Sequence, residues 1–215
     1  YAAKKLGIKS KIFMSNLVPQ HRRRAIENLG AEIIIKGKNS DEADSYARDY
    51  AINNNTTLIH PFDDEDIIAG QGTIGLEMLG SLPSIDTVVI PTSGGGLSGG
   101  IAIALKKKKP DIKIIAVSMK KGASMYESLK AGMPIDVIEE KTLADCLGGS
   151  IGLKNKYTFD IAKKTIDDFV LVDEDKIAEG IKYNFESHKI ITEGAAATSI
   201  MVVKEKLSKH IGNNV

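Results

Sequence analysis

A glycine-rich turn between an apolar strand pattern and a helical pattern is the segment best suited to chemistry. This glycine loop, which follows the apolar run 86–90, consists of Ser93, Gly94, Gly95, Gly96 and Leu97. Glycine backbones adopt positive φ and let consecutive N–H groups converge on one anion, while the new helix adds unpaired N–H groups and its dipole. The loop therefore predicts a phosphate-binding site.

Two other interpretations of the loop remain open, because a glycine-rich turn alone is weakly specific. A plain tight turn has no need of three consecutive glycines, and a dinucleotide site has a Gly-x-Gly-x-x-Gly spacing that the loop lacks. A dinucleotide site also needs an acid after the next apolar run to hold the ribose, and this sequence has Ser118 there. No Gly-Lys-Ser or Gly-Lys-Thr follows, as a nucleotide-binding P-loop requires. The pattern favours a phosphate-bearing cofactor on another fold.

Short runs rich in Val and Ile alternate with helical patterns, which is typical of βα units around a parallel sheet. The expected strands are 11–14, 32–36, 57–60, 86–90, 112–117 and 169–172. The expected helices are 19–29, one capped by Ser40, 66–79, 97–108, 123–131, 156–166, 174–187 and 194–208. Several strand patterns are apolar throughout, as expected when helices cover both faces of a sheet. The sequence predicts a doubly wound α/β fold, divided into residues 1–57 and 58–215.

Composition excludes several other classes of protein. Hydrophobic residues make up 42% and charged residues 27%, which is ordinary for a folded enzyme. The 29 Lys plus Arg balance the 28 Asp plus Glu, so the formal charge of +1 favours neither nucleic acid nor an anionic membrane. The single cysteine, Cys146, permits no internal disulfide and suits the reducing cytoplasm. No apolar stretch is long enough to span a bilayer.

The glycine loop resembles the tetraglycine phosphate loop of threonine dehydratases and serine racemases, with Ser93 in place of the first glycine. Those proteins are fold-type II pyridoxal-phosphate enzymes. Other blocks match the family in order: 60–64 (HPFDD), 68–74 (IAGQGTI), 124–129 (SMYESL), 143–145 (LAD) and 192–196 (TEGAA). Ser93 and the run 144–153 are most similar to dehydratases linked to hydroxyectoine breakdown. The resemblance covers nearly the whole chain.

The resemblance implies a small-lobe remainder at 1–57, a cofactor-binding lobe at 58–215, and a cytoplasmic homodimer. It also implies a dehydratase of a β-hydroxy amino acid such as threonine or serine, which loses its α-proton and its β-hydroxyl while the cofactor ring stores the electrons. Residues 93–97 would bind the phosphate, the backbone of Cys146 would flank the ring, and Glu193 would lie near it. Glu193 equally suits a helix cap. A racemase of the same family and a non-catalytic cofactor-binding module are the alternatives.

The chain departs from the family pattern in the residues that perform catalysis. The family's Ser-Phe-Lys-x-Arg-Gly block, whose lysine anchors the cofactor, is absent, as are its Ser-x-Gly-Asn carboxylate loop and its Ser-Gly-Gly-Asn ring-nitrogen turn. These blocks flank the matched region in the family, so we expect a chain truncated at both ends and inactive alone, with no catalytic residue assigned. Ser118 and Ser124 match the metal-binding acids of serine racemases, which predicts no metal site.

Overall fold

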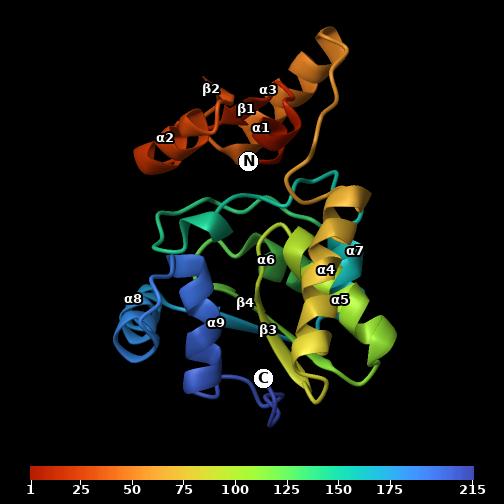
Figure 1. Ribbon diagram of the computed structural model, residues 1–215, viewed down its shortest axis with the longest axis vertical. Helices are drawn as coiled ribbons and strands as arrows, with labels where there is room; N and C mark the ends of the chain where they lie inside the picture. Colours follow the sequence, from red (N-terminus) through yellow and green to blue (C-terminus); the bar gives the residue numbers. More distant parts are fainter. The chain divides into compact units, whose positions relative to one another are not determined.

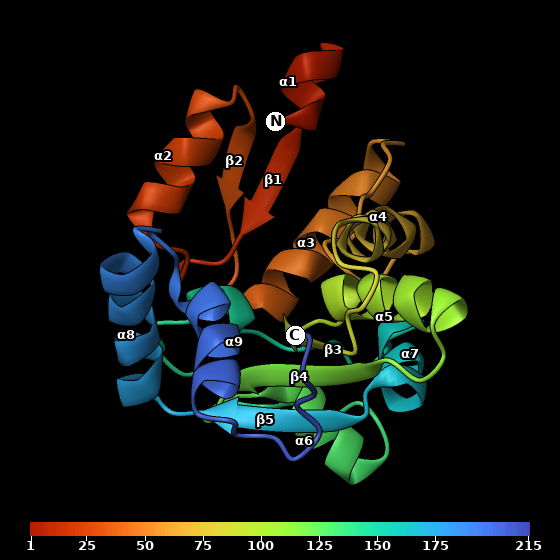
Figure 2. The ribbon, with the colours of Figure 1, turned by 60° about the horizontal axis from the view of Figure 1, so that its bottom comes forward.

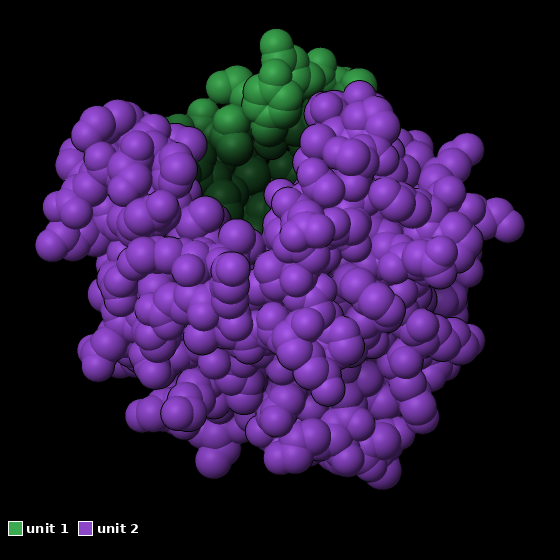
Figure 3. All heavy atoms as spheres, turned by 90° about the horizontal axis from the view of Figure 1, so that it is seen from below, with its two compact units in different colours: residues 1–59 green, residues 60–215 purple.

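The computed structural model describes all 215 residues, and most of their helices and strands are labelled in Figure 1 and, from another side and including β5, in Figure 2. The chain divides into two compact units, Tyr1–Ile59 and His60–Val215, which Figure 3 colours separately. This division lies two residues after the expected boundary between residues 57 and 58. The longest helix has 17 residues, and none of the helices is both long and apolar enough to cross a membrane.

The first unit contains two short parallel strands and three helices. In chain order they are α1 (Ala2–Leu6), β1 (Lys11–Met14), α2 (Gln20–Asn28), β2 (Glu32–Ile35) and α3 (Ser40–Asn53). β1 pairs with β2 in the register Lys11 to Glu32, and α3 contacts β1. Only Met14, Ser15 and Ala43 are buried, so this unit has a small core.

Two expectations in this region are wrong. Asn39, and not Ser40, caps α3, because the Asn39 side chain accepts the Glu42 N–H at 3.0 Å and Ser40 already lies in the first turn. The segment 57–60 forms no strand. It has no neighbouring strand to pair with, and Ile59 is 70% exposed, so its apolar pattern has no sheet to join.

The second unit contains a parallel three-stranded sheet between helices. In chain order its elements are α4 (Glu65–Ser81), β3 (Thr87–Pro91), α5 (Gly96–Lys108), β4 (Lys113–Met119), α6 (Ser124–Ala131), the 3₁₀ turn η1 (Asp145–Leu147), α7 (Thr158–Thr165), β5 (Asp168–Val172), α8 (Glu174–Tyr183), the π-helical turn η2 (Asn184–His188) and α9 (Gly194–Lys204). The strand order is β3-β4-β5, with Thr87 opposite Lys113 and Ile115 opposite Asp168. The expected α/β fold with parallel strands is confirmed, although its strands form two separate sheets.

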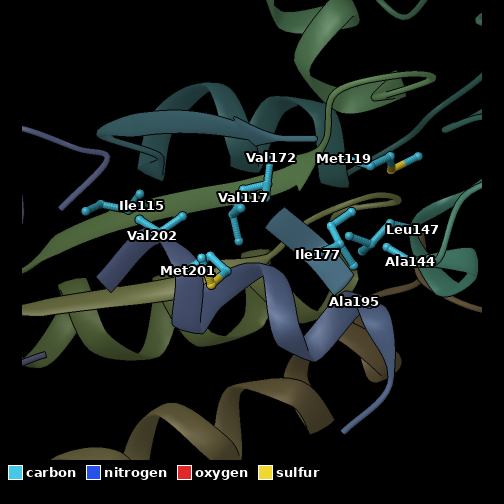
Figure 4. Close-up of a cluster of buried hydrophobic side chains, with 10 residues drawn as sticks. All are labelled: Ile115, Val117, Met119, Ala144, Leu147, Val172, Ile177, Ala195, Met201 and Val202. Atoms are coloured by element: carbon cyan, nitrogen blue, oxygen red, sulfur yellow. The ribbon is translucent and has the colours of Figure 1, made fainter. Parts of the chain in front are cut away.

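Helices cover both faces of the three-stranded sheet, and alternate residues of β4 point to opposite faces. Ile115, Val117 and Met119 pack in a buried cluster with residues of α8 and α9, which Figure 4 shows. Ile114 belongs to a second buried cluster, with residues of β3 and α5. This double coverage explains why β4 is apolar nearly throughout.

The second unit's α4 and α5 approach each other through glycines. A Cβ on Gly72 would lie 3.2 Å from the Gly100 carbonyl oxygen, and one on Gly75 would lie 3.0 Å from the Ile101 carbonyl oxygen. A Cβ on Gly100 would lie only 2.2 Å from the Ile68 carbonyl oxygen, so the backbones touch. Since α5 begins in the glycine loop, this contact fixes the direction in which the loop leaves β3.

Candidate functional site

The glycine loop connects β3 to α5 at the carboxyl end of a parallel strand, where ligands bind in open α/β sheets. The Thr92 N–H donates to the Val117 carbonyl at 2.8 Å, which continues the β3-β4 pairing up to the loop. Gly95 then takes a φ of +88° and precedes the first residue of α5, Gly96. The left-handed conformation of Gly95 turns the chain from strand to helix, and a side chain there would be strained.

The loop presents a row of unpaired hydrogen-bond donors. The backbone N–H groups of residues 94–98 donate to no acceptor within the chain, and the first turn of α5 contains no acid. Unpaired N–H groups at the positive end of a helix dipole favour an anion. Gly94, Gly95 and Gly96 have no side chains, so their backbone atoms would contact the ligand. These features fit the phosphate of pyridoxal phosphate.

Residues from three other segments, the turn before α4, α6 and α7, press directly against the glycine loop. A Cβ on Gly94 would lie 2.4 Å from Phe62 Cδ1, and one on Gly96 would lie 2.8 Å from the Phe62 carbonyl oxygen. A Cβ on Gly95 would lie 2.8 Å from Met125 Cε and 3.0 Å from Thr158 Cβ. The glycines are therefore required by packing as well as by ligand access. Sequence reasoning missed these walls, although Phe62 lies in the matched block 60–64.

The acids before α4 divide into two roles. Asp64 caps α4, since its Oδ1 accepts the N–H groups of Asp66 and Ile67 at 3.0 and 3.1 Å. Asp63 instead accepts N–H groups at the start of α7, far away in sequence. Asp64 therefore serves the dipole of the helix that follows it, whereas Asp63 serves α7.

Cys146 and Glu193, which were both expected beside the cofactor ring, lie close to each other. The Cys146 Sγ, a Glu193 carboxylate oxygen and an Asp145 carboxylate oxygen lie within 4.8 Å of one another. Close backbone contact creates this cluster, because a Cβ on Gly194 would lie 2.0 Å from the Leu143 carbonyl oxygen. Cys146 is exposed and forms no disulfide.

Glu193 has the helix-capping role that its sequence position suggested. One carboxylate oxygen accepts the Ala195 N–H at 3.0 Å, and the other accepts the Ala196 N–H at 2.8 Å. Both oxygens are therefore engaged at the start of α9. This occupation makes Glu193 a poor metal ligand, even though its neighbours in the cluster are residue types that bind metals.

The two serines that match metal-binding acids of serine racemases are buried hydroxyls with partners in the chain. Ser124 Oγ donates to the Gly149 carbonyl at 2.7 Å, and Ser118 Oγ lies 3.2 Å from Met119 Sδ. Neutral hydroxyls committed in this way are weak ligands for a hard cation. The absence of metal dependence stays a prediction.

Comparison with known proteins places the whole chain in one family at the level of sequence. A family model described as "Pyridoxal-phosphate dependent enzyme" matches residues 1–215. A threonine-dehydratase-like protein of Sinorhizobium fredii is 43% identical over 200 residues, covering 93% of this chain and 60% of that protein. A catabolic L-threonine dehydratase of Staphylococcus aureus is 40% identical over 195 residues, covering 91% and 56%. The chain therefore spans just over half the length of these relatives.

Solved structures agree with the sequence comparison. Serine racemase from maize superposes with a TM-score of 0.88 at 30% identity, covering 97% of this chain and 63% of that one. Threonine deaminase isoform 2 from Solanum lycopersicum superposes with a TM-score of 0.83 at 36% identity, covering 93% and 58%. With the parallel α/β fold, these matches establish that the chain belongs to the family of pyridoxal-phosphate-dependent enzymes.

Proposed function

We propose that the whole protein is a pyridoxal-phosphate-dependent dehydratase, or ammonia-lyase, that acts on a β-hydroxy amino acid such as threonine or serine. The observation that carries this proposal is the similarity to threonine dehydratases across more than nine tenths of the chain. An L-threonine ammonia-lyase of Thermotoga maritima is also 38% identical over 206 residues. We further propose that the enzyme is a cytoplasmic homodimer that requires no nucleic acid or membrane partner.

In this proposal the glycine loop binds the cofactor's phosphate through its backbone. The N–H groups of residues 94–98 supply the donors, Ser93 and Leu97 border them, and the left-handed Gly95 aims them together. The backbone of Cys146 flanks the cofactor ring, and Glu193 orders the start of α9 beside it. When bound, pyridoxal phosphate supplies an electron sink for the electrons left at Cα of the amino acid.

Residues 1–215 supply binding groups rather than the base that moves the proton. Proton transfer at Cα needs a base within hydrogen-bond reach, and no lysine here stands in a Ser-Phe-Lys-x-Arg-Gly block. We therefore assign no catalytic residue to this segment. Its own contribution is to hold and orient the cofactor, which is worth much of the rate in a positioned reaction.

A racemase of the same family is the second candidate, and the similarity to maize serine racemase favours it. Both reactions begin by removing the α-proton, and they differ in the fate of the deprotonated substrate. A dehydratase loses the β-hydroxyl and releases an oxo acid and ammonia, whereas a racemase returns the proton to the opposite face. The products therefore distinguish the two candidates.

The test compares the 215-residue chain with a version extended by the lysine block before Tyr1 and the ring-nitrogen turn after Val215. We expect the short chain to bind pyridoxal phosphate weakly, with none fixed to a lysine by borohydride. The extended version should be yellow and should release oxo acid from serine or threonine. Gly95→Asp in the extended version should abolish cofactor binding, because its carboxylate would occupy and repel the phosphate's place.

Three results would contradict this proposal. Formation of D-serine without oxo acid by the extended version would identify a racemase. Unchanged cofactor affinity in Gly95→Asp would exclude the glycine loop as the phosphate site. Stoichiometric fixing of the cofactor on one lysine of the short chain, with turnover of serine, would show that residues 1–215 contain the catalytic base after all.

A further inference from the structure

The segment 60–64 at the start of the second unit forms a compact turn that orients the side chains of Phe62 and Asp63. His60 Nδ1 accepts the Asp63 N–H at 2.8 Å and the Phe62 N–H at 3.3 Å, so this ring nitrogen acts as an acceptor. The His60 and Phe62 rings meet edge to face, with centroids 4.6 Å apart. The turn therefore fixes where the Phe62 ring and the Asp63 carboxylate lie relative to each other.

The Asp63 carboxylate binds the start of α7 across more than ninety residues. Its Oδ2 accepts the Lys156 N–H at 2.6 Å, and its Oδ1 accepts the N–H groups of Tyr157 and Thr158 at 2.8 and 3.0 Å. The residue at the N-cap position of α7, Tyr157, makes no side-chain cap bond. Asp63 thus caps α7 together with Asn155, whose Oδ1 accepts the Phe159 N–H at 2.8 Å, and the negative charge of Asp63 suits the positive end of that helix.

The two ends of this connection form two walls of the glycine loop, and Met125 forms a third. Phe62 packs on Gly94 and Gly96, while Thr158 packs on Gly95. Asn155 holds the Thr158 hydroxyl through a hydrogen bond of 2.8 Å from its Nδ2, so the Thr158 side chain is itself oriented. Asp63, next to Phe62 and bonded to Thr158, is the group that joins one wall to the other.

We propose that Asp63 is a positioning residue for the phosphate site, since it holds the Phe62 and Thr158 walls of the glycine loop in the spacing that directs the N–H groups of residues 94–98 at one anion. This inference rests on the proposed function of the loop. A carboxylate is required because three N–H donors share two oxygens, and charged acceptors form the stronger hydrogen bonds. Asparagine retains one acceptor oxygen, so it preserves part of the connection.

The neighbouring acid provides a matched control. Asp64 carries the same charge one residue away, but it caps α4 locally through Asp66 and Ile67. Removing either carboxylate removes one negative charge from the region, and that change alone would strengthen the binding of an anion. Weaker phosphate binding in an Asp63 variant would therefore result from a displaced loop, since the loss of negative charge has the opposite effect.

The experiment titrates inorganic phosphate into the 215-residue chain and follows the backbone amide signals of Gly94 to Gly96 by NMR. Asp63→Ala should weaken phosphate binding about tenfold and Asp63→Asn by a smaller factor, whereas Asp64→Ala should change it by less than about twofold, toward tighter binding. A parallel measurement compares pyridoxal phosphate with pyridoxal, which lacks the phosphate. Asp63→Ala should lose the preference for the phosphorylated form, and a general loss of stability would weaken both ligands alike.

The remaining outcomes show whether the proposed function of the loop fails or only the positioning role of Asp63 fails. If the wild-type chain shows no phosphate-dependent change at the glycine amides, the loop is not an anion site and both proposals fail. If the wild-type chain binds phosphate and the Asp63 and Asp64 variants weaken it equally, the loop function stands and the positioning role is overturned. Should Asp63→Ala fail to fold, Asp63→Asn decides, and wild-type affinity in that variant would overturn the role.

Discussion

At the scale of single residues, the glycine loop requires glycine because an added Cβ would clash with neighbouring residues. Three consecutive glycines are a signal that sequence can detect, and their use in directing N–H groups follows from backbone chemistry. The contact of Phe62 with Gly94 is not visible in sequence, because nothing local indicates which side chain will cover a turn. Packing at this position is close enough that one methyl group has no room.

Gly94→Ala should destabilise the protein by about 1–3 kcal/mol, because the new methyl group must displace the Phe62 ring. Gly70→Ala is the control, since Gly70 lies inside α4 with nothing within 4 Å of its Cβ position. That change should stabilise the protein by about 0.5–1 kcal/mol. Urea denaturation measures both, and equal effects of the two substitutions would contradict the close contact at Gly94.

Glu193 caps α9, and one pair of substitutions tests whether it also serves the cofactor. Glu193→Ala removes the cap of α9 and should cost about 0.5–2 kcal/mol of stability. Glu193→Ser keeps a capping oxygen and should cost less, while it removes the carboxylate beside the proposed ring site. If Glu193 serves the cofactor, both variants of the extended protein should shift its visible absorbance band equally. A normal band in Glu193→Ser would leave capping as the whole role.

At the scale of elements, Asp167 joins three segments of the second unit just before β5. Its carboxylate accepts from Lys106 Nζ of α5 at 2.7 Å and from the Ile114 N–H of β4 at 2.9 Å, and Lys113 Nζ lies 3.6 Å away. Burial alone would raise the pKa of Asp167. The hydrogen bonds from Lys106 and Ile114, with the two lysine charges, outweigh it and hold the pKa below its usual value.

Because the folded state lowers the pKa of Asp167, its stabilising contribution is present above the unfolded-state pKa and is lost as pH falls through the folded-state value. Asp167→Asn should therefore cost about 1–2 kcal/mol near neutral pH and progressively less in acid. Urea denaturation across acidic pH measures the difference. Asp111→Asn is the control, because Asp111 is exposed, and a constant Asp167→Asn deficit at all pH values would contradict the linkage.

Much of the fold was predictable from sequence because apolar runs and helix punctuation are local. The expected strands 11–14, 86–90 and 112–117 correspond closely to β1, β3 and β4. The failures are tertiary. Ile59 has an apolar strand pattern but no partner strand, and Asp63 stands before one helix while capping another. Neither result follows from the residues nearby, since a strand's partner and a carboxylate's distant donor depend on the whole chain path.

At the scale of the whole molecule, the two units differ in how much they bury. The first unit has three buried residues, whereas the clusters around β3, β4 and β5 contain most of the core. Low burial and exposed backbone hydrogen bonds accompany low local stability. The residues that follow α3, from Asn54 to Thr57, are all exposed and offer a protease an accessible backbone.

Limited proteolysis should therefore cut the chain near residues 53–59 before it cuts within the second unit. Amide hydrogens of β1 and β2 should exchange with solvent faster than those of β3 and β4, because less of the first unit is buried. Mass spectrometry detects both results. Equal protection of the two sheets would show that the first unit draws stability from contacts beyond its own core.

The bonds from Asp63 to α7 also have a consequence for folding kinetics. The partners of these bonds are separated by 93 to 95 positions in the sequence, so forming the bonds closes a long stretch of chain. Such contacts cost conformational entropy until the intervening elements have formed. The loop walls should therefore meet after the transition state. Phosphate bound to the completed loop would then leave the folding rate unchanged and slow unfolding. The anion would stabilise the native state without stabilising the transition state of folding.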